Sequence, residues 1–111
     1  MIDLITMDPL SLKLQALSDP TRRAILARLT SGQATVNELA EPFTMTLPAI
    51  SKHIKVLETA GLITRSRNAQ QRPCKLSTEG LREVDDWMNN YREMWEQRLD
   101  RLENYIETIK E

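Results

Sequence analysis

The chain has 111 residues, 41% apolar and 28% charged, which matches one folded domain and excludes a disordered or fibrous protein. One cysteine excludes an intramolecular disulfide, and together with one histidine it disfavours a self-contained zinc site, so we expect no metal and no cofactor. The net charge is −1, so a nucleic-acid function must depend on where the charge lies.

The location of the protein is predicted from two features that the sequence lacks. No apolar run approaches the ~18–20 residues needed to span a bilayer. Residues 1–20 lack the basic start and the apolar block of a secretory signal. We therefore expect no membrane partner and a cytoplasmic protein, in which the lone thiol stays reduced.

Two short helices are predicted in the first third of the chain. The segment Leu10–Leu17 follows a proline and has the pattern of a short amphipathic helix. In the next helix Asp19 is the expected N-cap and Pro20 the first helical residue. Its apolar residues lead to Gly32, a typical C-terminal stop.

Two further helices are predicted around a tight connection. Thr35 and a glutamate three residues later form a capping box, which predicts a short helix over Val36–Ala40. Thr46 is the expected N-cap of a helix over Leu47–Ala60, which ends before a glycine. On a helical wheel the apolar residues of this second helix form one narrow stripe, with polar and cationic residues opposite.

A hairpin is predicted next. Residues 62–67 and 72–77 have the composition of two short strands, and the polar segment Asn68–Gln71 joins them. Cys74 alternates with Leu76 on the second strand, so we expect it to be a small buried residue. A redox role, with Arg67 and Lys75 lowering the thiol pKa, is the alternative.

The last helix is predicted to open at Ser77 and to run over residues 81–110 with an apolar stripe at coiled-coil spacing. The preceding domain is too small to cover this stripe, so we expect a two-fold dimer, with Leu12 of the first helix beside it. A ligand pocket lined by Trp, Tyr and Met is the alternative use of the same face. The interface residues predicted on the last helix are Leu81, Val84, Met88, Tyr91, Trp95, Leu99, Leu102 and Ile106.

The charge is concentrated in the middle of the chain. Residues 44–76 have a net charge of +5, whereas residues 1–43 have −1 and residues 77–111 have −5. The basic segment coincides with the second helix of the tight pair and with the hairpin, an order typical of a winged helix-turn-helix. We therefore expect a single winged-helix domain over residues 1–111, mainly α with a small β-hairpin wing. Residues 10–80 would form its DNA-binding core, and 81–110 its dimerisation helix.

The residues expected to contact DNA lie on the helix over 47–60 and on the hairpin. Small residues near the helix N-terminus allow close approach to base edges, and two lysines can reach phosphates or guanine acceptors. Arginines on the hairpin suit a flanking minor groove or the DNA backbone. The candidates are Thr46, Pro48, Ala49, Ser51, Lys52, His53 and Lys55 on the helix, and Arg65, Arg67 and Arg72 on the hairpin.

Six of the polar residues have more than one interpretation. His53 lies beside the apolar stripe of its helix, so it can pack and hydrogen-bond locally or contact DNA. Arg22 and Arg23 can face DNA phosphates, but we expect them to pair with acidic residues across the fold. Solvated charges that protect the hairpin edge are the alternative for the three wing arginines.

Several strings in residues 10–80 are similar to those of the ArsR-type winged-helix repressors. They are LSDPTRRAILARL, VNELA and LPAISKHIKVLETAGLI, with the hairpin that follows. The resemblance implies a homodimeric DNA-binding repressor, with residues 47–60 as the recognition helix and 62–77 as the wing. It also favours the DNA contact for His53.

The sequence departs from the metal-sensing members of that family. The usual cysteine pair is absent from Val36–Ala40, and the last helix has carboxylates but no histidine. The chain instead resembles the branch without these ligands, in which an RPC-x-L wing and a last helix with Trp and Tyr are familiar. Arg72–Leu76, with Trp87, Tyr91 and Trp95, match those features.

We therefore expect a sequence-specific transcriptional regulator, a repressor, that binds double-stranded DNA at a pseudo-palindromic operator. The effector is not indicated by the sequence. The alternative is a winged-helix module for protein–protein contact through the Trp-rich last helix, which the basic centre disfavours. An enzyme is not expected, because one histidine and no phosphate-binding glycine-rich loop leave no recognisable catalytic arrangement.

Overall fold

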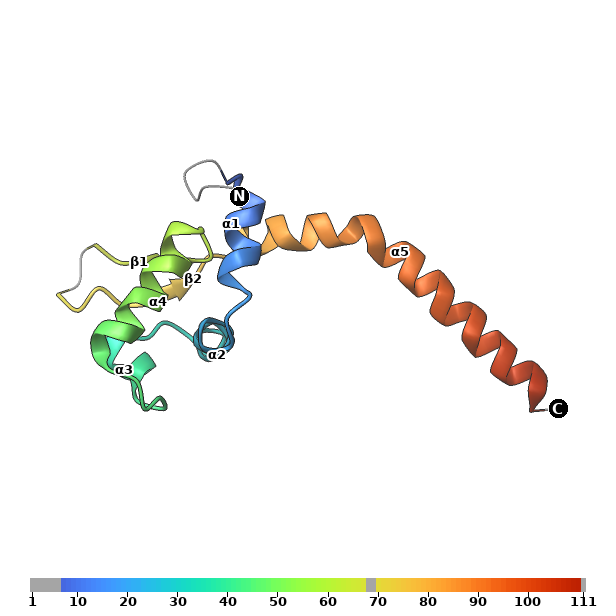
Figure 1. Ribbon diagram of the computed structural model, residues 1–111, viewed down its shortest axis with the longest axis horizontal. Coiled ribbons are helices and arrows are strands. Elements are labelled where there is room, and N and C mark those ends of the chain that lie inside the picture. The colour runs from blue at the N-terminus through green and yellow to red at the C-terminus, as the bar shows by residue number, and fades with distance from the viewer. Residues whose placement is uncertain (1–6, 68–69, 111) are drawn as a thin grey trace.

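The computed structural model describes residues 7–67 and 70–110, which form five helices and a two-stranded antiparallel hairpin. Four short helices and the hairpin gather at one end, and the long last helix projects away from them (Figure 1). The fold class is therefore the predicted winged helix-turn-helix. The elements are α1 (Pro9–Ala16), α2 (Pro20–Leu29), α3 (Val36–Ala40), α4 (Leu47–Thr59), β1 (Ile63–Arg65), β2 (Cys74–Leu76) and α5 (Thr78–Ile109).

Every helix begins at a side-chain cap. The five caps are Asp8, Asp19, Thr35, Thr46 and Ser77, and each side-chain oxygen accepts a hydrogen bond from the backbone N–H three residues later. The predicted capping box at Thr35 is complete, because the side chain of Glu38 also accepts from the backbone N–H of Thr35. These local interactions explain why the predicted caps Asp19, Thr35 and Thr46, and the opening at Ser77, are confirmed. The first helix covers Pro9–Ala16, one residue earlier at each end than the predicted Leu10–Leu17.

The end of α2 differs from the prediction. The helix ends at Leu29 instead of continuing to Gly32. The reason is that the backbone N–H groups of Thr30, Ser31 and Gly32 bond to carbonyls three residues back, so the chain tightens into a turn. Gly32 then adopts a positive φ of 133°.

The wing is shorter than predicted on both sides. Its strands cover three residues each, with Ile63 opposite Leu76 and Arg65 opposite Cys74. Arg72 has a left-handed backbone with φ of 43°, and the following proline has no N–H, so the ladder does not extend to residue 72. The predicted turn over residues 68–71 falls partly on residues 68–69, which lie outside the described residues.

One backbone pairing was missed from the sequence. Ala34, between α2 and α3, forms an antiparallel bridge with Cys74, through hydrogen bonds of 3.0 and 2.7 Å. The bridge attaches the start of β2 to the segment that precedes α3. It therefore limits how far the hairpin can move relative to α3 and α4.

The core lies between α2, α3, α4 and the hairpin. Its largest fully buried side chains come from all four elements and from the turn before β1. They are Ile25, Leu39, Ile50, Ile54, Leu57, Leu62, Ile63 and Cys74. Packing of the α3–α4 pair against this core holds the exposed face of α4 in a fixed orientation.

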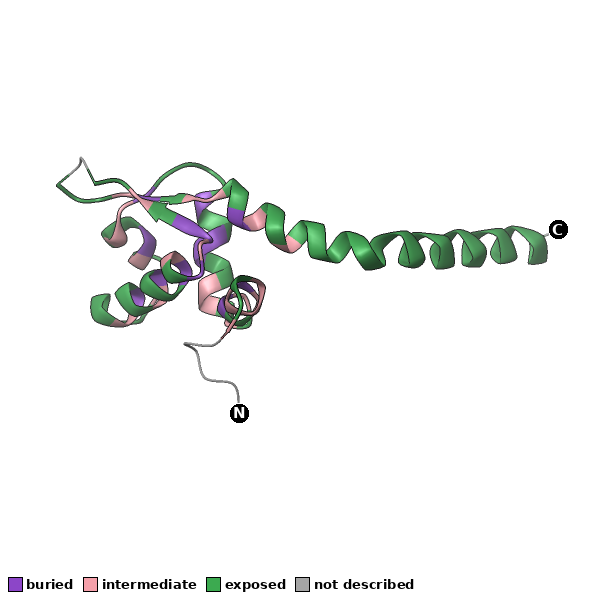
Figure 2. Cartoon of the chain, turned by 90° about the horizontal axis from the view of Figure 1, so that it is seen from above, coloured by how far each residue is buried: buried purple, intermediate pink, exposed green. Residues whose placement is uncertain are grey.

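The first two turns of α5 are fixed to the rest of the domain by two contacts. Gly80 is buried against the backbone of Gly61, at the turn that follows α4, so closely that no side chain fits between them. Lys13 of α1 is also buried, and its Nζ forms an ion pair with Glu83 at 3.0 Å. Beyond this root, α5 is exposed along nearly its whole length and gives the molecule a long dimension of 64 Å (Figure 2).

Within the described residues, no helix is long and apolar enough to cross a membrane. Residues 1–6, which belong to the segment used for the expectation about a secretory signal, lie outside the described residues.

Candidate nucleic-acid interface

Helix α4 presents two chemically different faces. Ile50, Ile54 and Leu57 are buried, as the helical wheel predicted. Thr46 caps the helix, its Oγ1 accepting from the N–H of Ala49 at 3.3 Å. The cap fixes the start of α4, and the buried residues fix its inner side. The face opposite the buried residues therefore points outward in a fixed orientation.

The exposed face of α4 contains most of the predicted DNA-contacting residues. Thr46, Pro48, Ser51, Lys52 and Lys55 are exposed, and Ala49 is half-buried. Neither lysine forms an ion pair within residues 7–67 and 70–110. Both ammonium groups are therefore available to an anionic ligand.

The wing arginines are divided between two environments. Arg67 and Arg72 are exposed near the tip. Arg65 is half-buried, and its Nε and Nη2 both donate to the carbonyl oxygen of Arg72, at 3.1 and 3.0 Å. Arg65 thus holds together the two sides of the hairpin, a role that its place in the sequence did not indicate.

The partners of Arg22 and Arg23 differ from those predicted. Instead of pairing with acidic residues across the fold, both guanidinium groups bind carbonyl oxygens at the C-terminal end of α1. Arg22 donates to Ala16 at 2.7 Å and to Gln15 at 3.2 Å, and Arg23 donates to a third carbonyl, that of Leu17. The last carbonyls of a helix lack partners within the helix, which explains why cations gather there.

His53 lies on the side of α4 that faces α2 and is half-buried. Its Nδ1 is 3.3 Å from Nη1 of Arg22 and 3.9 Å from Oδ2 of Asp19. The ring is thus engaged locally, as one of the two sequence interpretations expected. It does not share the fully exposed face of Lys52 and Lys55.

Cys74 is fully buried, as predicted. Burial raises the pKa of its thiol above the ordinary value, and this effect exceeds the opposing influence of Arg65. The cations that act on the thiol are Arg65 and Arg72, not the predicted Arg67 and Lys75. The environment therefore favours the protonated thiol over a reactive thiolate.

The predicted dimer residues fall into two groups. Leu12 packs partly against the protein's own core together with Leu81, and Val84 is half-buried at the root of α5. The others are exposed along the projecting helix: Met88, Tyr91, Trp95, Leu99, Leu102 and Ile106. Trp87 and Tyr91 make an edge-to-face contact with their ring centroids 5.7 Å apart, which widens the apolar face near the root.

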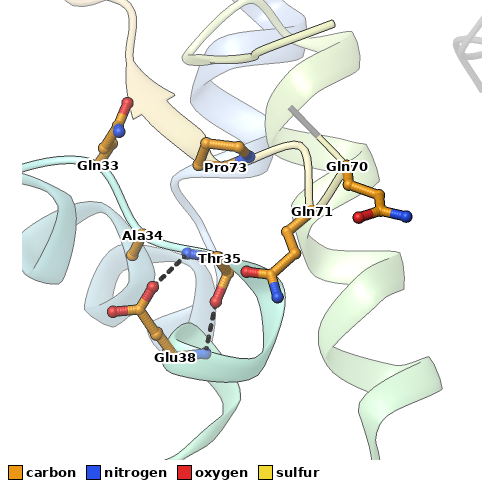
Figure 3. Close-up of a pocket in the computed structure, with 7 residues that line it drawn as sticks. All are labelled: Gln33, Ala34, Thr35, Glu38, Gln70, Gln71 and Pro73. Carbon is orange, nitrogen blue, oxygen red and sulfur yellow. Dashed lines mark hydrogen bonds between the residues drawn. The ribbon is translucent and has the colours of Figure 1, made fainter. Parts of the chain in front are cut away.

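Two hollows large enough for a small ligand lie on the surface of the described residues. A polar hollow of about 380 Å³ lies between the start of α3 and the wing, lined by glutamine side chains and by the Thr35–Glu38 capping box (Figure 3). A second hollow of about 390 Å³ lies on α5 and is lined by Met88, Tyr91, Arg92, Met94 and Trp95. Within the described part of the chain, no group of three or more His, Cys, Asp or Glu side chains is arranged to hold a metal ion.

Comparisons with known proteins identify the helix-turn-helix as a shared feature. A helix-turn-helix domain family matches residues 17–66. The transcriptional repressor SdpR of Bacillus subtilis is 39% identical over 77 residues, which are 69% of this chain and 86% of that repressor. The HTH-type transcriptional regulator Rv2034 of Mycobacterium tuberculosis is 45% identical over 67 residues, 60% of this chain and 63% of that protein. The crystal structure of an ArsR family transcriptional regulator superposes with a TM-score of 0.73 at 45% identity, covering 80% of this chain and 98% of that one.

Proposed function

The chain belongs to the ArsR family of winged helix-turn-helix transcriptional regulators, and from this premise we propose that it is a homodimeric repressor that binds a pseudo-palindromic DNA operator. In this proposal α4 enters the major groove, and the wing contacts the flanking backbone or minor groove. No catalytic step is assigned to the protein. Because chromosomal DNA is its proposed ligand, we place it in the cytoplasm.

The single observation on which the DNA interface rests is the exposed face of α4. Lys52 and Lys55 lie on it without an ion-pair partner among the described residues, opposite a fully buried apolar stripe. Small residues at the start of the helix let its backbone approach base edges, where Ser51 can bond either donors or acceptors. Arg67 and Arg72 extend the cationic surface along the wing, where they add affinity more than sequence choice.

The dimer interface in the proposal is the apolar stripe of α5, beside α1. The 32-residue helix is about 48 Å long at ~1.5 Å per residue. The core covers only its first turns, so large apolar side chains such as Trp95, with 60% of its surface exposed, contact water in the single chain. Contiguous exposure of this kind marks an interaction surface. A two-fold partner would bury it and would place two α4 helices about one DNA turn, ~34–36 Å, apart.

The first test is selection of bound sequences from random duplexes, followed by fluorescence anisotropy across a salt series. We expect one inverted repeat to be enriched and its affinity to fall steeply with salt, by about 0.9 log units per log unit of salt for each phosphate contact. Weak binding without an enriched sequence would contradict the proposal.

The second test isolates the α4 lysines. The double variant Lys52→Ala, Lys55→Ala should lose more than about tenfold in operator affinity and show a smaller salt dependence, with the fold intact. The matched control is Arg101→Ala, Lys110→Ala, which removes the same charge from the far part of α5 and its C-cap. It should bind almost as the natural protein does. Equal losses in the two double variants would mean that overall charge, not the α4 face, determines binding.

A further inference from the structure

The side of α4 that faces α2 holds a charged cluster that the proposed DNA interface does not use. His53 lies between Arg22 and Asp19, with Nδ1 3.3 Å from the guanidinium and 3.9 Å from the carboxylate. Arg22 is itself held by two carbonyls at the end of α1. Through this arginine, the recognition helix is joined by polar contacts to α1 as well as to α2.

The contact with Arg22 requires an acceptor on the ring. A guanidinium has only N–H donors and does not lose its proton in proteins. The contact is therefore a hydrogen bond only when Nδ1 offers its lone pair, which is the case for the neutral ring with its proton on Nε2. In this state Arg22 donates to α1 and to α4 at the same time.

A proton on Nδ1 reverses these preferences. The ring can then no longer accept from Arg22, and two cations face each other across 3.3 Å. The carboxylate of Asp19 becomes the favoured partner, and approach by about 1 Å would make that pair a charge-assisted hydrogen bond. Asp19 is ionised at neutral pH, since the backbone N–H of Arg22 lowers the pKa of its carboxyl.

The groups that face His53 come from two elements. Arg22 and Asp19 belong to α2 and its cap, while α1 contributes the two carbonyls already bound to Arg22. On α4 itself Lys52 precedes the ring in sequence and points to the exposed face. The same ring nitrogen thus faces two partners with opposite requirements. Arg22 can only donate a hydrogen bond to it, and the carboxylate of Asp19 can only accept one from it.

We propose that His53 and Arg22 are positioning residues for the recognition helix, and that protonation of His53 exchanges its Arg22 contact for one with Asp19 and thereby weakens operator binding. This inference rests on the proposed function. Imidazole is the side chain whose ring nitrogen can act as an acceptor when it is neutral and as a donor when it is protonated, which is what the two partners require. By linkage, DNA would bind the neutral form more tightly and would release a proton on binding.

The sign of the pH effect separates this role from a direct contact. A histidine that binds a phosphate gains affinity for DNA when it is protonated, as any added cation does. The positioning role predicts the opposite, with weaker binding at low pH. We expect operator affinity to be several-fold lower at about pH 5.5 than at about pH 8. Affinity that rises on acidification, or does not change, would overturn the inference.

Two variants test the partners of the ring. His53→Asn keeps an acceptor near the Nδ1 position that does not titrate, so its operator affinity at about pH 5.5 should differ little from its own affinity at about pH 8. Asp19→Asn keeps an α2 cap and removes the charge, so it should move the transition to lower pH. An unchanged pH profile in both variants would assign the effect to other groups and refute the role of His53.

The exchange can also be followed without DNA. His53 is the only histidine of the chain, so untagged protein gives one imidazole signal in an NMR titration. Its midpoint should fall in Asp19→Asn and rise in Arg22→Gln, and no shift in either variant would overturn the inference. Circular dichroism would confirm that each variant is folded. A protein that binds no duplex at either pH would contradict the proposed function itself, whereas pH-independent operator binding would contradict only this inference.

Discussion

The contact between Gly80 and Gly61 predicts an unusual response to the substitution Gly80→Ala. Gly80 is a helical residue in the first turn of α5, where alanine would ordinarily stabilise the helix by about 1 kcal/mol. A Cβ at this position would overlap the carbonyl oxygen of Gly61 and approach the Cα of Leu62 to 3.5 Å. The atoms that would have to move are backbone atoms, which cannot escape by changing rotamer.

The two effects have opposite signs, and the clash is the larger. Forcing an extra carbon into a well-packed site costs about 1–3 kcal/mol, and rigid backbone neighbours place Gly80 at the upper end of that range. After subtraction of the gain in helix propensity, we expect a net loss of about 2 kcal/mol in the free energy of unfolding. This loss corresponds to a fall of about 1 M in the urea midpoint.

The assay is urea unfolding followed by circular dichroism, with natural and variant proteins at the same protomer concentration because a dimer's stability depends on it. Gly32→Ala is the control. A Cβ at Gly32 meets no atom within 4 Å, so its cost comes only from the positive φ. If Gly80→Ala were neutral or stabilising, helix propensity alone would account for it, and the close approach of α5 to the α4–β1 turn would be refuted.

Three further predictions concern other parts of the chain. Glu83→Gln should lower the free energy of unfolding by about 1–3 kcal/mol, because it leaves the ammonium of Lys13 buried without a carboxylate. Lys13→Met should lower it by less, and urea unfolding of the two variants measures both losses. Equal losses would show that the charge of Lys13 is not the source of the cost. Trp95→Glu should shift the protein toward monomer in sedimentation equilibrium, whereas Asp100→Ala should not, and a variant dimer of unchanged strength would exclude the α5 stripe as the interface. Cys74 should react with a thiol reagent at neutral pH at least about 100-fold more slowly in the native protein than in urea, because burial raises the pKa of its thiol; comparable rates would show that the residue is accessible.

The parts of the fold that sequence predicted correctly depend on interactions within a few residues. Each helix starts at a side chain that bonds to the backbone three residues later, so Asp19, Thr35 and Thr46 could be identified from spacing alone. The buried face of α4 follows from its apolar periodicity for the same reason. Lys52 and Lys55 lie on the face opposite those apolar positions and are exposed for that reason. The candidate interface could therefore be predicted from the sequence.

The parts that sequence missed depend on contacts between distant residues. The bridge between Ala34 and Cys74 joins two segments forty positions apart, and no local pattern marks Ala34 as a strand residue. Arg22 and Arg23 were expected to find carboxylates, but backbone carbonyls are present at every helix end and leave no mark in a sequence. A glycine inside a strongly periodic helix was the one available signal for Gly80, since such a residue costs stability unless packing requires it.

The near-neutral composition of the chain is compatible with DNA binding because of where α5 lies. Residues 77–111 have a net charge of −5, which in a compact domain would oppose the +5 of residues 44–76. In the structure α5 projects away from the core, while the wing extends on the opposite side (Figure 1), and the molecule is 64 Å long. Charges are screened over about 8 Å at physiological ionic strength, so most of the acidic residues on α5 lie too far from α4 to repel a duplex bound there. The same separation makes Arg101 and Lys110 suitable for the control variant. Replacing them with alanine changes the net charge as much as replacing Lys52 and Lys55 does. It does not change the electrostatic field at the recognition helix.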